Sequence, residues 1–198
     1  MDPFTQHKGL VVTLDRANVD TDQIIPKQFL KRIERTGFGD FLFYDWRYTD
    51  GPNLVPNADF ELNRPQFHGA TVLVTRRNFG SGSSREHAVW ALDNFGIRAV
   101  LAPSFADIFY NNCFKNGLLP VVLTEEQIEH IFAAVAARPG YQLTVDLQTQ
   151  SVHDDQGWKA SFEVEPARRH RMLNGLDDIA MTLKHESAIT EFENRRAG

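Results

Sequence analysis

The sequence contains a single cysteine, Cys113, in 198 residues. One thiol cannot form an intramolecular disulfide, and it cannot supply the several thiolates that hold a structural zinc ion or an iron–sulfur cluster. We therefore expect no metal or cofactor of that kind to be bound by this chain. Apolar residues flank Cys113 at helical spacing, which favours a buried thiol that acts as a small hydrophobic side chain.

Long apolar runs and an excess of positive charge are also missing. The N-terminus has only the short strand-like run of residues 10–12, and no stretch approaches the roughly 20 apolar residues that span a bilayer. The 21 Lys and Arg residues face 26 Asp and Glu residues, which gives a formal net charge of -5. This balance argues against nucleic-acid and membrane partners but permits a local basic site for a small acid. We expect a cytoplasmic protein.

The order of apolar segments predicts the fold class. With 42% hydrophobic and 24% charged residues, the chain has the composition of one substantial globular domain, and we expect a single domain over residues 1–198. Strand-length apolar runs at 10–14, 70–75, 98–102 and 118–123 alternate with segments of helical period, which indicates an α/β architecture. Residues 141–164 suggest short strands around the turn 154–157, and a helical C-terminal tail is expected from about residue 166, with a break at 174–175.

Three segments combine helical periodicity with residues that start or stop helices. The first begins at Ser84 and stops at Gly96, a residue suited to a left-handed C-terminal turn. The second follows Ser104, ends near Gly117, and is predicted to bury one set of side chains, namely Phe105, Ile108, Phe109 and Cys113. The third begins with the capping-box pattern of residues 124–127.

The segment between residues 15 and 69 is rich in aromatic residues, Gly and Pro and has no clean period. It includes the run GFGDFLFYDWRY at residues 37–48. A loop of this length in a compact domain is usually functional or covered by a partner. Trp46 and its aromatic neighbours fit a partner-facing patch, although core packing is the default for such residues, and the sequence leaves both open.

The Gly/Ser-rich stretch of residues 78–87 lies between a predicted strand and a predicted helix. Gly80 and Gly82 allow the backbone to approach a ligand closely, and the free amides and dipole of the helix start favour an anion. Arg85 adds a planar fork that suits a carboxylate or phosphate. The pattern therefore predicts an anion site.

Helix capping and nucleotide binding are two other interpretations of this stretch. Ser83 and Glu86 have the spacing of a capping box, in which their side chains only satisfy backbone amides. Spacing alone leaves capping and anion binding equally open. Nucleotide binding is disfavoured, because no lysine follows the glycines as in a P-loop and Arg85 occupies the third glycine position of the dinucleotide fingerprint.

The residues GSSREH at 82–87, after a predicted strand, resemble the signature of the swivelling fourth domain of aconitases and of isopropylmalate dehydratase small subunits. Residues 18–26, 38–47, 102–109 and 174–177 support the resemblance, which covers nearly the whole chain in the right order. The implied fold is a single swivelling β/β/α domain of the aconitase C-terminal type.

The resemblance also implies an activity and a partner. Together with its partner, a small subunit of this family interconverts 2-isopropylmalate and 3-isopropylmalate through 2-isopropylmaleate in leucine biosynthesis. The chain is therefore expected to be a hydro-lyase subunit that is inactive alone. The [4Fe-4S] cluster is expected in a large iron–sulfur subunit, and isopropylmalate is the expected substrate. The run at 38–47 resembles the bacterial leucine-pathway type. A related enzyme acting on homoaconitate, citraconate or another branched malate is the first alternative, and a non-catalytic anion-binding module is the second.

Five site residues follow from the family by position. The resemblance makes Ser83 the catalytic base and assigns Ser84 and Arg85 to a substrate carboxylate. A serine hydroxyl is a poor base unless its alkoxide is stabilised, which a helix N-terminus and an arginine can do. Asp22, in the Thr-Asp pair after the first strand, would help to arrange the active site, and the alternative is an acidic turn or cap residue. The resemblance places Lys31 in the loop, residues 28–32, that in the family distinguishes the substrate side group, and the alternative is a solvated basic loop.

Glu86 and His87, which end the signature, are expected to have structural roles. Glu86 is expected to cap the helix or to orient Arg85, and His87 is expected to pack and to form hydrogen bonds rather than to titrate in catalysis.

Overall fold

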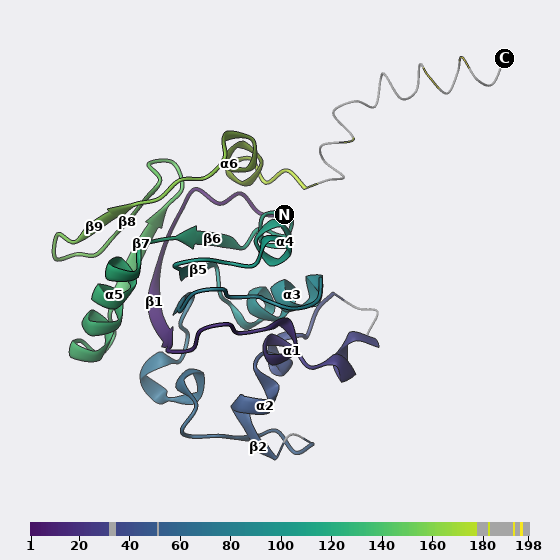
Figure 1. Ribbon diagram of the computed structural model, residues 1–198, viewed down its shortest axis with the longest axis vertical. Helices are drawn as coiled ribbons and strands as arrows, with labels where there is room; N and C mark the ends of the chain where they lie inside the picture. The colour runs from purple at the N-terminus through teal and green to yellow at the C-terminus, as the bar shows by residue number, and fades with distance from the viewer. Residues whose placement is uncertain (32–34, 51, 178–181, 183–191, 193–194, 196–198) are drawn as a thin grey trace.

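The computed structural model of the protein describes residues 1–31, 35–50 and 52–177, together with residues 182, 192 and 195. Its central feature is a seven-stranded sheet with the order β6-β5-β4-β1-β7-β8-β9 (Figure 1). The first four strands of that order are parallel to one another. Beyond β1, each of the strands β7, β8 and β9 pairs antiparallel with the strand before it. The strands are β1 (Gln6–Leu14), β4 (Val72–Thr75), β5 (Ala99–Ala102), β6 (Leu119–Val122), β7 (Gln142–Asp146), β8 (Ser151–His153) and β9 (Lys159–Ser161).

Helices connect successive strands, and the sheet separates two hydrophobic cores. Helix α3 (Glu86–Phe95) connects β4 to β5, α4 (Asp107–Asn116) connects β5 to β6, and α5 (Glu125–Ala137) connects β6 to β7. Neighbouring residues of a strand point to opposite faces of the sheet. Leu73 accordingly packs in the core beneath α3, whereas Val72 and Val74 pack in the core beneath α5. This α/β arrangement confirms the predicted fold class.

The long segment between β1 and β4 folds into short elements that close the core beneath α3. In chain order they are α1 (Thr21–Ile24), the 3-10 helix η1 (Lys27–Lys31), η2 (Gly39–Phe41), α2 (Tyr44–Arg47), the hairpin strands β2 (Tyr48–Asp50) and β3 (Val55–Pro56), η3 (Glu61–Asn63) and η4 (Pro65–Phe67). Phe38, Leu42 and Phe43 are fully buried, and Trp46 stacks on Phe43 with ring centroids 5.8 Å apart. Core packing therefore explains these aromatic residues.

Two predicted helix details are wrong. Helix α3 begins at Glu86 rather than Ser84, because Ser83 and Ser84 belong to the preceding loop. Ile108 was placed on the buried face of α4, but its side chain is 48% exposed. Phe109 and Cys113, one helical turn apart, are buried as predicted, and Phe114 completes the buried face. The capping box at the start of α5 is confirmed, since Thr124 and Gln127 exchange both hydrogen bonds.

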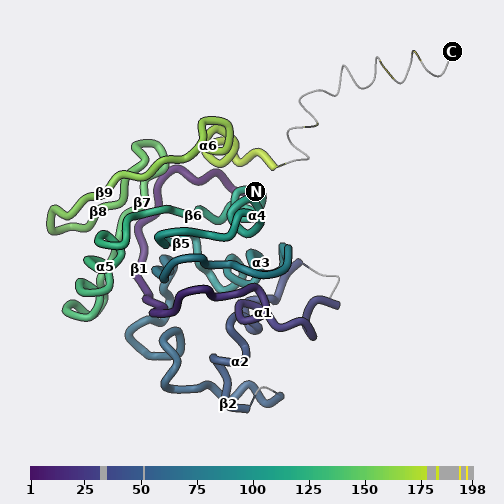
Figure 2. The backbone as a smooth tube through the Cα atoms, viewed as in Figure 1, coloured from purple at the N-terminus to yellow at the C-terminus, as the bar shows by residue number. Residues whose placement is uncertain are grey.

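Helix α6 (Pro166–Leu173) confirms a helical segment at the predicted start of the C-terminal tail, and Gly175 follows with a φ of +64°. The N-terminal segment runs beside α6, where the Phe4 N–H donates to the Met172 carbonyl at 2.9 Å (Figure 2). Most of the predicted tail beyond residue 177 lies outside the described residues. Within the described part, none of the helices has both the length and the apolar character that crossing a membrane requires.

The turn between β8 and β9 is organised by Asp154, which is only 7% exposed. Its carboxylate accepts hydrogen bonds from the backbone N–H groups of Gln156 and Trp158, both at 2.9 Å, and from the Tyr141 hydroxyl at 3.1 Å. Arg138 lies 3.4 Å away. Burial by itself would raise the pKa of Asp154, but these donors outweigh it and lower the pKa. The charged form is therefore the one that stabilises this turn.

We expect Asp154→Asn to lower the free energy of unfolding by about 1–3 kcal/mol, because the amide NH₂ would face the donors of Tyr141 or Arg138 without an acceptor. The adjacent Asp155→Asn removes only an exposed pair with Lys8 and should cost less than about 1 kcal/mol. Urea unfolding measures both. Since the folded pKa is lowered, the difference from wild type should be present above the pKa of an unfolded aspartate and should shrink as the pH falls through the folded pKa. Equal losses for the two variants would contradict this role of Asp154.

Candidate active site at the carboxyl ends of β1 and β4

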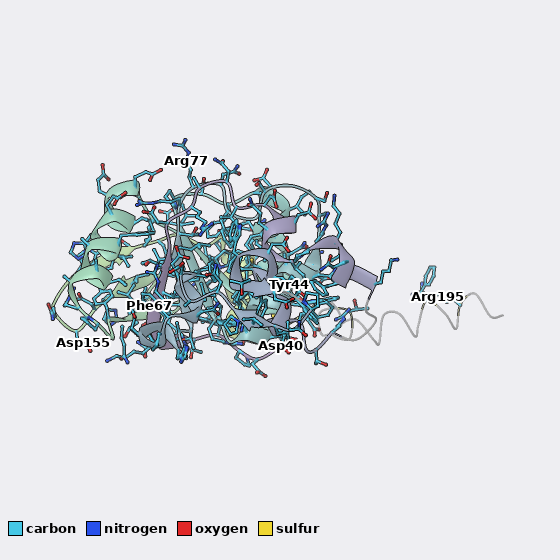
Figure 3. All side chains as sticks on the ribbon, turned by 90° about the horizontal axis from the view of Figure 1, so that it is seen from below. Asp40, Tyr44, Phe67, Arg77, Asp155 and Arg195 are labelled. Carbon is cyan, nitrogen blue, oxygen red and sulfur yellow. The ribbon has the colours of Figure 1, made fainter. Side chains whose placement is uncertain are left out.

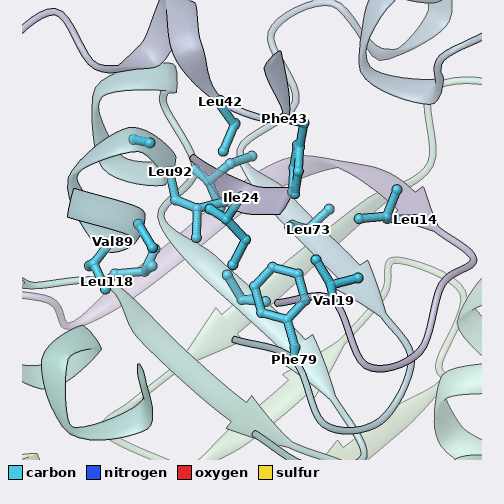
Figure 4. Packing of buried hydrophobic residues seen from close by; sticks show 14 of the residues in the cluster. Leu14, Val19, Ile24, Leu42, Phe43, Leu73, Phe79, Val89, Leu92 and Leu118 are labelled. Atoms are coloured by element: carbon cyan, nitrogen blue, oxygen red, sulfur yellow. The ribbon is translucent and has the colours of Figure 1, made fainter. Parts of the chain in front are cut away.

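The candidate site is formed by the two segments that leave the carboxyl ends of the neighbouring parallel strands β1 and β4. The segment after β1 contains α1, and the segment after β4 is the Gly/Ser-rich loop, residues 76–85. Both are anchored in the core, where Val19, Ile24 and Phe79 pack together near Leu73 (Figure 4). Such an edge of parallel strands is a common place for ligand sites in α/β proteins.

Backbone hydrogen bonds join the Gly/Ser-rich loop to the segment that leads into α1. The Val19 carbonyl accepts from the N–H groups of Gly80 at 2.8 Å and Ser81 at 3.2 Å, and the Thr21 N–H donates to the Ser81 carbonyl at 2.8 Å. On the other side, the Phe79 N–H donates to the Ser104 carbonyl at 3.2 Å. The loop is therefore held from both sides.

Gly80 and Gly82 are required by this backbone path. Their φ angles are +79° and +92°, a region that residues with a side chain rarely adopt. A Cβ atom on Gly80 would lie 2.1 Å from Cγ of the Phe109 ring, so the loop backbone rests directly on that ring. The loop keeps this close approach only with glycine at position 80.

Ser83 and Ser84 are exposed, and their hydroxyls form no hydrogen bond with any residue that the structure describes. The N-cap of α3 is Arg85, and no side chain caps the helix. The capping-box interpretation of Ser83 and Glu86 is therefore wrong, because the helix begins too late for Ser83 to reach its amides. Two serine hydroxyls remain available beside the open N-terminus of a helix.

Glu86 has a different role from the one expected. Its carboxylate accepts a hydrogen bond from the Asn116 side-chain amide at 2.9 Å, and Asn116 in turn accepts from the Trp90 indole at 2.9 Å. Glu86 thus links α3 to α4 and neither caps the helix nor orients Arg85. His87 packs against Phe38 and Trp90, with ring centroids at 5.5 and 4.7 Å, and burial lowers its pKa. The expectation that His87 packs is confirmed.

The structure brings Asp22 and Arg85 into contact although they are far apart in the sequence. Arg85 Nη1 donates a hydrogen bond to Asp22 Oδ1, and the Arg85 side chain is only 9% exposed. The hydrogen bond from Arg85 is the main cause that lowers the pKa of Asp22, with a smaller contribution from Lys27, whose Nζ lies 3.6 Å from Asp22 Oδ2. Asp22 is therefore a carboxylate that fixes the direction of the Arg85 guanidinium.

Helix η1 carries two lysines, Lys27 and Lys31. Lys31 is exposed at the end of η1, and no contact among the described residues joins it to the Gly/Ser-rich loop. Lys27, at the start of η1, is the site residue that the sequence analysis missed, because no local pattern connects it to Asp22. Arg77 lies at the start of the loop but projects into solvent (Figure 3). Among the arginines of the loop, Arg85 is thus the one held in the site by Asp22.

The side chains that the structure describes do not fit a metal cluster. The described residues contain no group of three His, Cys, Asp or Glu side chains that could hold a metal ion. Cys113 is fully buried on α4, and burial raises the pKa of its thiol, which disfavours the thiolate that a metal needs.

Comparisons with known proteins agree with this architecture. The family model of the aconitase C-terminal domain matches residues 1–126, and the model of the C-terminal domain of 3-isopropylmalate dehydratase small subunits matches residues 178–198. The solved structure of a 3-isopropylmalate dehydratase from Methanocaldococcus jannaschii superposes with a TM-score of 0.68 at 25% identity, covering 94% of this chain and 98% of that one. The expected aconitase C-terminal fold is confirmed.

Curated relatives match over nearly their whole length. A 3-isopropylmalate dehydratase small subunit from Rhodopirellula baltica is 65% identical over 196 residues, which cover 99% of this chain and 100% of the relative. Another from a Geobacillus species is 57% identical over 195 residues, with 98% of each chain covered. The chain therefore belongs to the family of 3-isopropylmalate dehydratase small subunits.

Proposed function

We propose that this chain is the small subunit of a 3-isopropylmalate dehydratase, which interconverts 2-isopropylmalate and 3-isopropylmalate through 2-isopropylmaleate in leucine biosynthesis. The observation that carries the proposal is the placement of two exposed serines next to Arg85 at the N-terminus of α3. The serine hydroxyls bind no described residue, and the Arg85 guanidinium is oriented by Asp22. The substrate is a branched hydroxy diacid, so it offers carboxylates to the guanidinium and a carbon-bound proton to a base.

Ser83 is proposed as the catalytic base. In the dehydration step its alkoxide takes the proton from carbon, the C–H electron pair becomes the new C=C bond, and the hydroxyl group leaves from the neighbouring carbon. Rehydration reverses these changes with the hydroxyl on the other carbon. The positive end of the α3 dipole and the Arg85 cation both favour the alkoxide, which lowers the free energy of forming it.

Arg85 and Ser84 are proposed to hold a substrate carboxylate. A guanidinium has five N–H donors, so Arg85 can bind Asp22 with part of its fork and a substrate carboxylate with the rest. Asp22 then acts in the site by holding Arg85 in direction. The Ser84 hydroxyl, exposed beside Arg85, supplies a further donor.

Lys31 is proposed to select the substrate side group. It ends η1, and Phe29 of the same element stacks on Phe41 at 4.0 Å and meets Tyr44 edge-on at 4.7 Å. These aromatic contacts fix η1 to the segment around α2, so that Lys31 is carried on an anchored element. Homoaconitate, citraconate or another branched malate would be discriminated from isopropylmalate at this position.

The proposed partner is a larger subunit that carries a [4Fe-4S] cluster, which supplies a Lewis acid for the departing hydroxyl when it is bound. We further propose that residues 1–198 act as one swivelling domain with a C-terminal tail from about residue 166, and that the enzyme works in the cytoplasm. The relatives named as small subunits support the need for a second subunit.

Reconstitution tests the proposal directly. The purified chain should give no dehydration of isopropylmalate, because removal of the carbon-bound proton does not by itself expel a hydroxyl group. Addition of the large subunit with an intact cluster should produce turnover, followed by the absorbance of 2-isopropylmaleate. Robust turnover by the chain alone would refute the split enzyme. Binding of a small diacid by the chain, without turnover when the large subunit is added, would favour the anion-binding module.

Replacing Arg85 tests the carboxylate site. Arg85→Lys should lower kcat/KM of the reconstituted enzyme by about 30- to 5000-fold, because losing a charge-assisted pair costs roughly 2–5 kcal/mol and a lysine cannot reproduce the fork. Assembly with the large subunit should persist. The matched control is Arg77→Lys, an exposed arginine at the start of the same loop, which should remain near wild type. If Arg85→Lys has normal kinetics, Arg85 does not bind the substrate.

A further inference from the structure

Thr21 lies directly beneath the Gly/Ser-rich loop, although the proposed chemistry does not use it. The residue is only 2% exposed. Its hydroxyl donates a hydrogen bond to the Ser83 carbonyl at 3.0 Å, and its backbone N–H donates to the Ser81 carbonyl at 2.8 Å. Between these two attachments, a Cβ atom on Gly82 would lie 3.4 Å from the Thr21 hydroxyl. One buried residue thus binds the loop backbone on both sides of Gly82, at Ser81 and at Ser83.

The hydrogen bond to Ser83 fixes more than one carbonyl group. A trans peptide is planar, so its C=O and N–H groups point in opposite directions. With the Ser83 carbonyl turned toward Thr21, the Ser84 N–H points away from Thr21. No described residue accepts a hydrogen bond from that N–H, and Ser84 is exposed. The orientation of this single peptide therefore decides whether a free N–H donor faces outward beside the Ser83 and Ser84 hydroxyls.

The Thr21 hydroxyl is not needed to form α1. Asp20 caps that helix, because its carboxylate accepts from the Gln23 N–H at 2.8 Å while the Gln23 side chain accepts from the Asp20 N–H at 2.9 Å. The Thr21 side chain instead makes its hydrogen bond across to the loop. A valine at this position would fill the same volume and leave the Ser83 carbonyl without this donor.

We propose that Thr21 is a positioning residue for the dehydration reaction. Its hydroxyl holds the Ser83–Ser84 peptide so that the Ser83 hydroxyl faces the substrate carbon and the Ser84 N–H faces a substrate carboxylate. This inference rests on the proposed function and extends it to a residue that does not touch the substrate.

The test compares Thr21→Val, which removes the hydroxyl, with Thr21→Ser, which keeps it, in the complex with the large subunit. Thr21→Val should lower kcat by about 100-fold, the effect of a misplacement of roughly 1 Å, and should change KM much less. Thr21→Ser should restore most of kcat. The matched control is Thr75→Val, since Thr75 is also buried and donates to a carbonyl, that of Arg16 at 3.2 Å, but does not contact the loop serines. Thr75→Val should keep kcat close to wild type.

Backbone mobility gives a second readout that needs no activity. In the full chain, the NMR order parameters of the Ser83 and Ser84 amides should fall in Thr21→Val and remain high in Thr21→Ser and Thr75→Val. Wild-type kcat and unchanged order parameters in Thr21→Val would overturn the positioning role, as would a Thr21→Ser variant that is as impaired as Thr21→Val. If the wild-type complex shows no dehydration at all, the proposed function fails, and the order parameters alone decide whether Thr21 holds the loop.

Discussion

The attachment of α1 to the Gly/Ser-rich loop is the interaction on which the whole candidate site depends. A loop with two glycines at positive φ has many conformations available in the absence of other contacts, and fixing each residue costs about 1–2 kcal/mol of conformational entropy. Here Val19 and Thr21 bind the backbone of the loop, while Asp22 binds the side chain of Arg85. Because these residues follow β1 and the loop follows the adjacent β4, the parallel pairing of the two strands brings the attachments together.

The same arrangement explains how a nearly buried arginine keeps donors for the substrate carboxylate that we propose it binds. A guanidinium that is 9% exposed needs a partner for its charge, and Asp22 provides one without using all five donors. Lys27, near the second oxygen of Asp22, adds positive charge to the site. Two positive charges thus surround one carboxylate in a chain whose formal net charge is -5.

The sequence predicts this fold well where the signals are local and poorly where they depend on distant contacts. The strand runs and the capping box at Thr124 follow from neighbouring residues, and both are present. Ser83 and Glu86 have the same spacing as a capping box, yet the helix starts only at Glu86, and the Ser83 carbonyl accepts a hydrogen bond from the distant Thr21. The partnership of Asp22 with Arg85 could not be derived from spacing, since the pairing of β1 with β4 creates it. The contact of Lys27 with Asp22 depends on the turn of the chain between α1 and η1, which no spacing rule predicts. The long aromatic segment lacked a period because it folds into short elements over a core.

The central claim is that Ser83 removes the carbon-bound proton, and isotope exchange measures this step most directly. Substrate carrying deuterium on the carbon that loses its proton should release the label to water when the wild-type complex turns over. Ser83→Ala should assemble with the large subunit, bind substrate and keep wild-type stability, since the structure gives its hydroxyl no capping role. Label release by this variant should fall to the background rate. Release at the wild-type rate by Ser83→Ala would show that another group is the base.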